Sequence, residues 1–136
     1  MKKYVVIVLL LMAAVLLAAC GGGGQSEEII MDEPMPKGGE DAFLVELEFS
    51  AEEIVPDHIT IPAGEKILFV VFNSDTESGD MNEDHNLVSP DLGLREILVV
   101  PGQTVRRIWE GYEEPGTYKV GCTIHPWIVM EITVEE

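Results

Sequence analysis

Short apolar runs separated by Gly, Pro, Asn and Asp fill the chain from residue 41 to residue 136. Residues 43–49 alternate between apolar and mostly polar side chains, which is the period of a strand with one buried face. Residues 67–72 are continuously apolar, as expected of a strand buried on both faces. Apolar residues continue around Pro56, and later strands are predicted at 87–88, 92–100, 104–109, 116–121 and 128–134. The pattern is typical of an all-β sandwich or barrel and contains no convincing helix or internal repeat.

The first residues of the chain follow a different pattern. Lys2 and Lys3 precede an apolar run, Tyr4 to Ala19, of 16 residues. This layout is that of a secretory signal, and the run is short for a transmembrane helix. The string Leu17-Ala18-Ala19-Cys20 resembles the lipobox of bacterial lipoproteins, which implies cleavage before Cys20 and acylation of its sulfur. We predict a signal peptide over 1–19. An uncleaved anchor helix is the alternative, and either places the remainder outside the cytoplasm and tethered to a membrane.

Residues 20–40 are rich in Gly, Pro and acidic side chains and lack an apolar period. Such a composition favours an extended, solvated chain. We therefore predict a flexible acidic tether over 20–40 and one folded domain over 41–136.

The charge of the chain limits its partners. Eight Lys and Arg against 25 Asp and Glu give a formal net charge of −17, and removal of Lys2 and Lys3 with the signal would give 6 − 25 = −19. A chain this acidic is not expected to bind nucleic acid. The same charge would attract a cationic partner protein. We expect the chain to be a monomer.

The predicted domain contains a single cysteine, Cys122, so no disulfide can form within it. His125 follows three residues later and Met130 five residues beyond that, while His85 lies upstream. A thiolate, two imidazoles and a thioether are the ligand set of a blue-copper site, in which three ligands are trigonal and the methionine is a weak axial ligand. We therefore predict one copper ion, Cu(I) or Cu(II), held by these four residues.

Further stretches of the domain are similar to cupredoxins of the plastocyanin and amicyanin type. The resemblance covers about residues 42–136 and rests, besides the ligands, on 59–65, 72–75, His85-Asn86 and 115–118. It implies an eight-stranded Greek-key β-sandwich with copper at one end. It also implies that Asn86 joins the two ligand-bearing segments by hydrogen bonds, and that electrons pass through the exposed imidazole edge of His125 beside Pro126-Trp127.

The axial ligand is left open between two alignments. The spacing from Cys122 in plastocyanin-like proteins points to Met130. An alignment through the last strand follows the amicyanin pattern and puts Ile128 at the methionine position. Period-two alternation turns both side chains inward. We take Met130 as the ligand, because a thioether suits the weak axial role; with Ile128 there, copper would be three-coordinate and its reduction potential higher.

These observations predict a membrane-tethered electron carrier rather than an enzyme, since the chain has only three histidines and lacks the further sites of multicopper enzymes. The expected redox partner is a cationic protein, such as a c-type cytochrome, or a membrane oxidoreductase. One alternative is a lipoprotein that stores or delivers copper. A second is a red-copper protein similar to nitrosocyanin, with Glu83 or Asp84 as a ligand, although the simpler interpretation of both is a solvated loop charge. A zinc site is disfavoured by the methionine, and a metal-free adhesin would leave the spacing of Cys122 and His125 without a reason.

Overall fold

The computed structural model describes residues 28–76 and 83–136. The predicted signal peptide, Cys20 and the first part of the predicted tether lie outside the described residues, so these assignments stay predictions. No helix in the described part of the chain is long and apolar enough to cross a bilayer.

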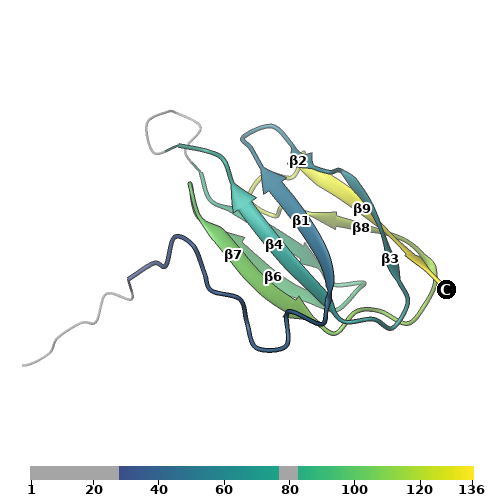
Figure 1. The fold of residues 1–136 in the computed structure, drawn as a ribbon. Coiled ribbons are helices and arrows are strands. Elements are labelled where there is room, and N and C mark those ends of the chain that lie inside the picture. Colours follow the sequence, from purple (N-terminus) through teal and green to yellow (C-terminus); the bar gives the residue numbers. More distant parts are fainter. Residues whose placement is uncertain (1–27, 77–82) are drawn as a thin grey trace, which may run out of the picture.

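Within those residues the chain forms nine strands in two facing sheets (Figure 1). The four-stranded sheet has the order β2-β1-β4-β7, and its strands are Ile54–Val55, Phe43–Phe49, Ile67–Asn73 and Thr104–Trp109. The five-stranded sheet has the order β3-β9-β8-β5-β6, and its strands are His58–Pro62, Val129–Glu135, Gly116–Gly121, His85–Ser89 and Leu94–Val99. The predicted all-β sandwich is confirmed.

The described residues contain nine strands where eight were expected, because the segment around Pro56 is divided between the sheets. Before the proline, β2 pairs with β1, and Ile54 lies opposite Phe49. After it, β3 runs parallel to β9 in the other sheet. Proline lacks a backbone N–H and cannot continue a ladder on both sides. The interruption therefore marks the point where the chain crosses from one sheet to the other.

Alternating side chains build the core between the sheets. In β1, Val45, Leu47 and Phe49 are buried, whereas Glu46 and Glu48 face solvent. The continuously apolar β4 lies between β1 and β7, and most of its side chains are buried. Removing these apolar surfaces from water is the main favourable contribution to folding. The core therefore supplies a rigid base for the loops at the ends of the strands.

Strand ends from both sheets meet at one end of the sandwich. His85, at the start of β5, pairs with Val99 at the end of β6. Asn73, at the end of β4 in the other sheet, donates from Nδ2 to the carbonyl of Val99 over 3.3 Å. The buried Asn73 side chain thus joins the two sheets at this end.

The described part of the predicted tether lies along the edge strand β7. Asp32 forms a parallel bridge with Thr104, whose N–H donates to the carbonyl of Met31 over 2.7 Å. The Glu33 carboxylate accepts hydrogen bonds from the Arg107 guanidinium and, over 3.0 Å, from the Arg106 N–H. These contacts pair backbone groups of a strand edge that would otherwise face solvent. The tether boundaries themselves stay a prediction.

Replacing Glu33 by glutamine tests this contact. The hydrogen bond from Arg107 lowers the pKa of Glu33, against the opposing effect of burial. A carboxylate with a lowered folded pKa stabilises the fold above its unfolded pKa, and this contribution is lost as pH falls through the folded pKa. We expect E33Q to lose about 0.5–1 kcal/mol of unfolding free energy at pH 7, since the pair is partly solvated. The difference from wild type should vanish in acid, measured by urea denaturation over a pH series.

The matched control is E40Q, because Glu40 lies in the same arm and makes no ion pair with the described residues. An equal loss in E33Q and E40Q at pH 7 would contradict the role of the Arg107 contact.

Candidate metal centre

Two segments of the five-stranded sheet deliver three potential ligands to one point. His85 is the first residue of β5, Cys122 directly follows β8, and His125 lies in the turn that leads into β9. The turn is closed by two backbone hydrogen bonds, from the Cys122 N–H to the Ile128 carbonyl at 3.1 Å and from the Ile128 N–H to the His125 carbonyl at 2.9 Å. Residues 37 positions apart in the chain are thereby brought into contact.

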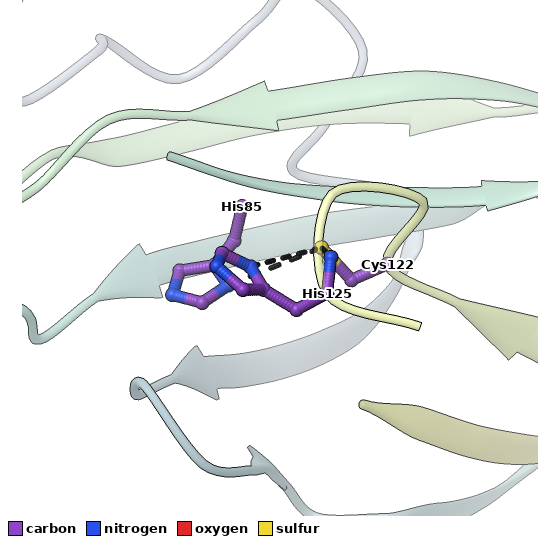
Figure 2. Close-up of side chains that lie close together, drawn as sticks. All are labelled: His85, Cys122 and His125. Carbon is purple, nitrogen blue, oxygen red and sulfur yellow. Dashed lines mark hydrogen bonds between the residues drawn. The ribbon is translucent and has the colours of Figure 1, made fainter. Parts of the chain in front are cut away.

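Figure 2 shows both imidazoles turned toward the cysteine sulfur. The Cys122 Sγ lies 3.9 Å from His85 Nδ1 and 3.7 Å from His125 Nδ1, and the three ligand atoms are all within 4.8 Å of one another. Metal–sulfur and metal–nitrogen bonds of the usual lengths, set at trigonal to tetrahedral angles, separate sulfur from nitrogen by about 3.6–3.8 Å. The three residues therefore fit a single copper ion, and all three are buried.

Hydrogen bonds hold the cysteine sulfur in place. The backbone N–H groups of Asn86 and His125 each donate to Sγ over 3.4 Å. The Asn86 side chain accepts from the Thr123 N–H and donates to Thr123 Oγ1, both over 2.7 Å. The expected link between the two ligand-bearing segments is thus confirmed at Asn86. These donors fix the position of the sulfur, and the thiolate is the form of cysteine that binds metal.

Aromatic rings pack around the histidines. The Phe49 ring stacks on His85 with centroids 5.0 Å apart and planes 4° from parallel. Trp127 packs its edge against His125 at 5.1 Å, and 63% of Trp127 is exposed. His125 itself is only 5% exposed. The expectation that its imidazole edge is open to solvent is therefore wrong. The difference arises because Nε2 of His125 faces the Glu83 carboxylate.

A carboxylate lies beside the outer nitrogen of each histidine. Asp75 Oδ2 is 2.9 Å from Nε2 of His85, and the Glu83 carboxylate contacts Nε2 of His125. Neither carboxylate belongs to the cluster of three ligand atoms. The interpretation of Glu83 as a solvated loop charge is therefore incomplete, while Asp84 is exposed. Asp75 was missed because it appeared only as the polar end of a strand, and no spacing rule connects it to His85.

The β8–β9 register positions both candidates for the axial place. Gly121 lies opposite Val129 and Val120 opposite Met130, so the next pair along the ladder is Cys122 and Ile128. Ile128 and Met130 are each 1% exposed. Directly opposite side chains lie about 5 Å apart, whereas diagonal ones are about 7–8 Å apart. By this register Ile128 is the nearer of the two to the cysteine.

The sandwich and the thiol–imidazole cluster at one of its ends define a β-sandwich protein with a candidate metal site. Residues 7–134 match the family described as cupredoxin-like domain. The chain belongs to this family, as the sequence resemblance predicted. A comparison with curated protein sequences gives no match.

Three solved structures illustrate how widely the fold is shared. Reduced auracyanin from Roseiflexus castenholzii has 16% identity and a TM-score of 0.56, over 70% of this chain and 98% of its own. The periplasmic domain of cytochrome oxidase subunit II of Bradyrhizobium japonicum has 15% identity and a TM-score of 0.57, over 76% and 88%. The metal-binding domain of the Cu(I)-exporting ATPase CopA of Streptococcus pneumoniae D39, solved with Cu(I), has 12% identity and a TM-score of 0.55, over 79% and 97%. At these identities the likeness concerns the fold.

Replacing Asn86 by alanine tests how the cluster is held together. The substitution removes the buried Asn86 amide, which bonds the N–H and hydroxyl of the exposed Thr123 and also the Glu96 carboxylate. Each hydrogen bond lost contributes about 0.5–1.5 kcal/mol, since water can take the place of Asn86 at the exposed groups. We expect N86A to lose about 2–3 kcal/mol of unfolding free energy in the metal-free protein, measured by urea denaturation. A loss no larger than that of a surface substitution would contradict the role assigned to Asn86.

Proposed function

We propose that this protein is a membrane-tethered blue-copper electron carrier that acts outside the cytoplasm. The observation that carries the proposal is the buried cluster of His85, Cys122 and His125, whose ligand atoms lie within 4.8 Å of one another. Copper held by one thiolate and two imidazoles supplies a reversible one-electron couple, because this ligand set accepts both oxidation states. The chain's own contribution is to hold these ligands in one geometry and to keep water away.

The geometry supports electron transfer because little has to move when the charge of the ion changes. His85 is 0% exposed and stacks on Phe49, and Sγ is held by two backbone donors. Ligands locked by packing and hydrogen bonds keep their positions in both oxidation states. An exposed, easily exchanged site would suit copper storage or delivery better. The CopA metal-binding domain, which shares the fold, is the reason to test that alternative.

The anchor, location and partners are further parts of the proposal. The lipobox-like Cys20 supports a lipid anchor on a membrane outside the cytoplasm. A lipid-anchored chain with a formal charge of 6 − 25 = −19 would attract a cationic redox partner, such as a c-type cytochrome or a membrane oxidoreductase. Trp127, exposed and in contact with His125, supplies an apolar contact at the copper end.

Copper loading of the protein tests the function. We expect one Cu(II) per chain, an intense visible thiolate band, a narrow copper hyperfine splitting in the electron paramagnetic resonance spectrum, and reversible bleaching by ascorbate. The Cys122→Ser variant should lose the band, because an alcohol oxygen cannot replace the thiolate.

The same measurement separates the alternatives. A red or colourless centre with normal hyperfine splitting would contradict the blue-copper proposal and favour a carboxylate-ligated site. Ready transfer of Cu(I) to a competing thiol, without a stable blue form, would favour copper delivery.

For the axial place, the register supports Ile128 over the predicted Met130, because Ile128 lies opposite Cys122 on the neighbouring strand. A branched alkyl group offers no lone pair to the ion. We therefore propose a three-coordinate copper with His85, Cys122 and His125 as its ligands.

Two matched substitutions test this assignment. Met130→Leu should leave the optical band and the reduction potential nearly unchanged, because it only exchanges one core side chain for another of similar volume. Ile128→Met should lower the potential and alter the ratio of the absorption bands, because it brings a thioether to the axial place. A large spectral change in M130L, with I128M unchanged, would restore Met130 as the ligand.

A further inference from the structure

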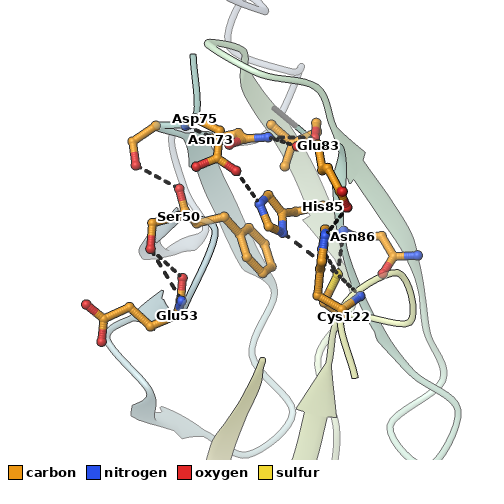
Figure 3. Close-up of polar contacts among 12 residues, drawn as sticks. Ser50, Glu53, Asn73, Asp75, Glu83, His85, Asn86 and Cys122 are labelled. Atoms are coloured by element: carbon orange, nitrogen blue, oxygen red, sulfur yellow. Dashed lines mark hydrogen bonds and ion pairs between the residues drawn. The ribbon is translucent and has the colours of Figure 1, made fainter. Parts of the chain in front are cut away.

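The two imidazoles of the cluster share an arrangement that the ligand set alone does not require. Each imidazole turns Nδ1 toward the Cys122 sulfur and Nε2 toward a carboxylate. The carboxylate is Asp75 for His85, as Figure 3 shows, and Glu83 for His125. With Nδ1 on the metal side, Nε2 is the nitrogen that carries the proton and donates. Both carboxylates come from the connection between β4 and β5, one near each of its ends.

The buried side chain of Asn73 holds both carboxylate residues in position. Its Oδ1 accepts from the Asp75 N–H over 3.0 Å, and its Nδ2 donates to the Glu83 carbonyl over 3.1 Å. The neighbouring Ser74 hydroxyl is tied to the carbonyl of Phe49 over 2.9 Å. Asn73 is 0% exposed, so this clasp belongs to the core. The core therefore fixes the backbone from which each carboxylate extends toward its histidine.

A carboxylate in this position has a defined effect on a metal centre. A carboxylate that accepts a hydrogen bond from Nε2–H makes Nδ1 a stronger electron donor to the metal. The negative charge also stabilises Cu(II) more than Cu(I), since Coulomb attraction grows with the charge of the ion. Water screens the charges of the two carboxylates to different extents, because the Asp75 side chain is 10% exposed and that of Glu83 is 52% exposed. The buried carboxylate should therefore have the larger effect.

We propose that Asp75 and Glu83 are positioning residues that lower the reduction potential of the copper centre, with Asp75 the stronger of the two. The inference rests on the proposed copper site. Two features of the site then act on the reduction potential in opposite directions: an alkyl group at the axial place raises it, and the two carboxylates lower it. The carboxylates further orient both imidazoles before the metal binds.

The test compares three isosteric substitutions in the full chain: D75N, E83Q and the control D84N. Asp84 neighbours Glu83, is exposed, and makes no hydrogen bond or ion pair with the described residues. Each variant removes one negative charge, so a general charge effect would appear in all three. The reduction potential is measured by redox titration of the thiolate band. In the metal-free protein, the hydrogen-bonded Nε2 proton of each histidine is observed by nuclear magnetic resonance.

We expect D75N to reduce the ratio of Cu(II) to Cu(I) affinity about tenfold, which for one electron raises the potential by about 59 mV. E83Q should reduce the ratio about threefold and D84N less than twofold. The Nε2 proton signal of His85 should shift or exchange faster in D75N only. Equal shifts in all three variants, or an unchanged potential in D75N, would overturn the inference while the blue-copper function stands. Absence of the thiolate band in the wild type would instead overturn the proposed function and, with it, this inference.

Discussion

The centre depends on keeping a thiol and two imidazoles close together in a place from which water is excluded. None of these groups is buried without cost, because each must exchange hydrogen bonds to water for bonds within the protein. Backbone N–H groups supply hydrogen bonds to the Cys122 sulfur, and the Asn86 side chain supplies them to Thr123. The two carboxylates supply hydrogen-bond partners to His85 and His125. The cluster can therefore be organised before a metal ion arrives.

Two buried asparagines have corresponding roles on either side of the cluster. Asn86 joins the β5 segment to the turn that bears Cys122, within the five-stranded sheet. Asn73 joins the end of β4 to Val99 of the opposite sheet and to the two carboxylate residues. An amide can donate and accept at the same time, which a carboxylate cannot do. Joining strands from both sheets at one end makes the metal end a part of the core and not a set of independent loops.

The edge of the sandwich opposite β2 is organised by charge. The arm formed by residues 28–40 follows β7, and its Glu33 is bound by Arg107. The side-chain amide of Gln103 donates to the Ile30 carbonyl over 2.8 Å, and this bond joins the arm to the loop before β7. A backbone N–H of the same loop donates to the Asn73 carbonyl. An arm paired with the strand edge protects it against pairing with other chains. In the same arm, Ile29 and Ile30 are both more than half exposed.

The sequence alone determined the sheet class, most strand positions and the Cys122–His125 pair of the candidate metal site, because alternation and close ligand spacing are local properties. His85 was found only because the ligand set needed a second imidazole and the family resemblance supplied its position. Tertiary structure decided the rest. The division at Pro56, the pairing of Ile128 with Cys122, and the contact of Asp75 with His85 depend on which strands become neighbours. Strand register and loop packing depend on residues that are far apart in the sequence, so local sequence patterns do not predict them.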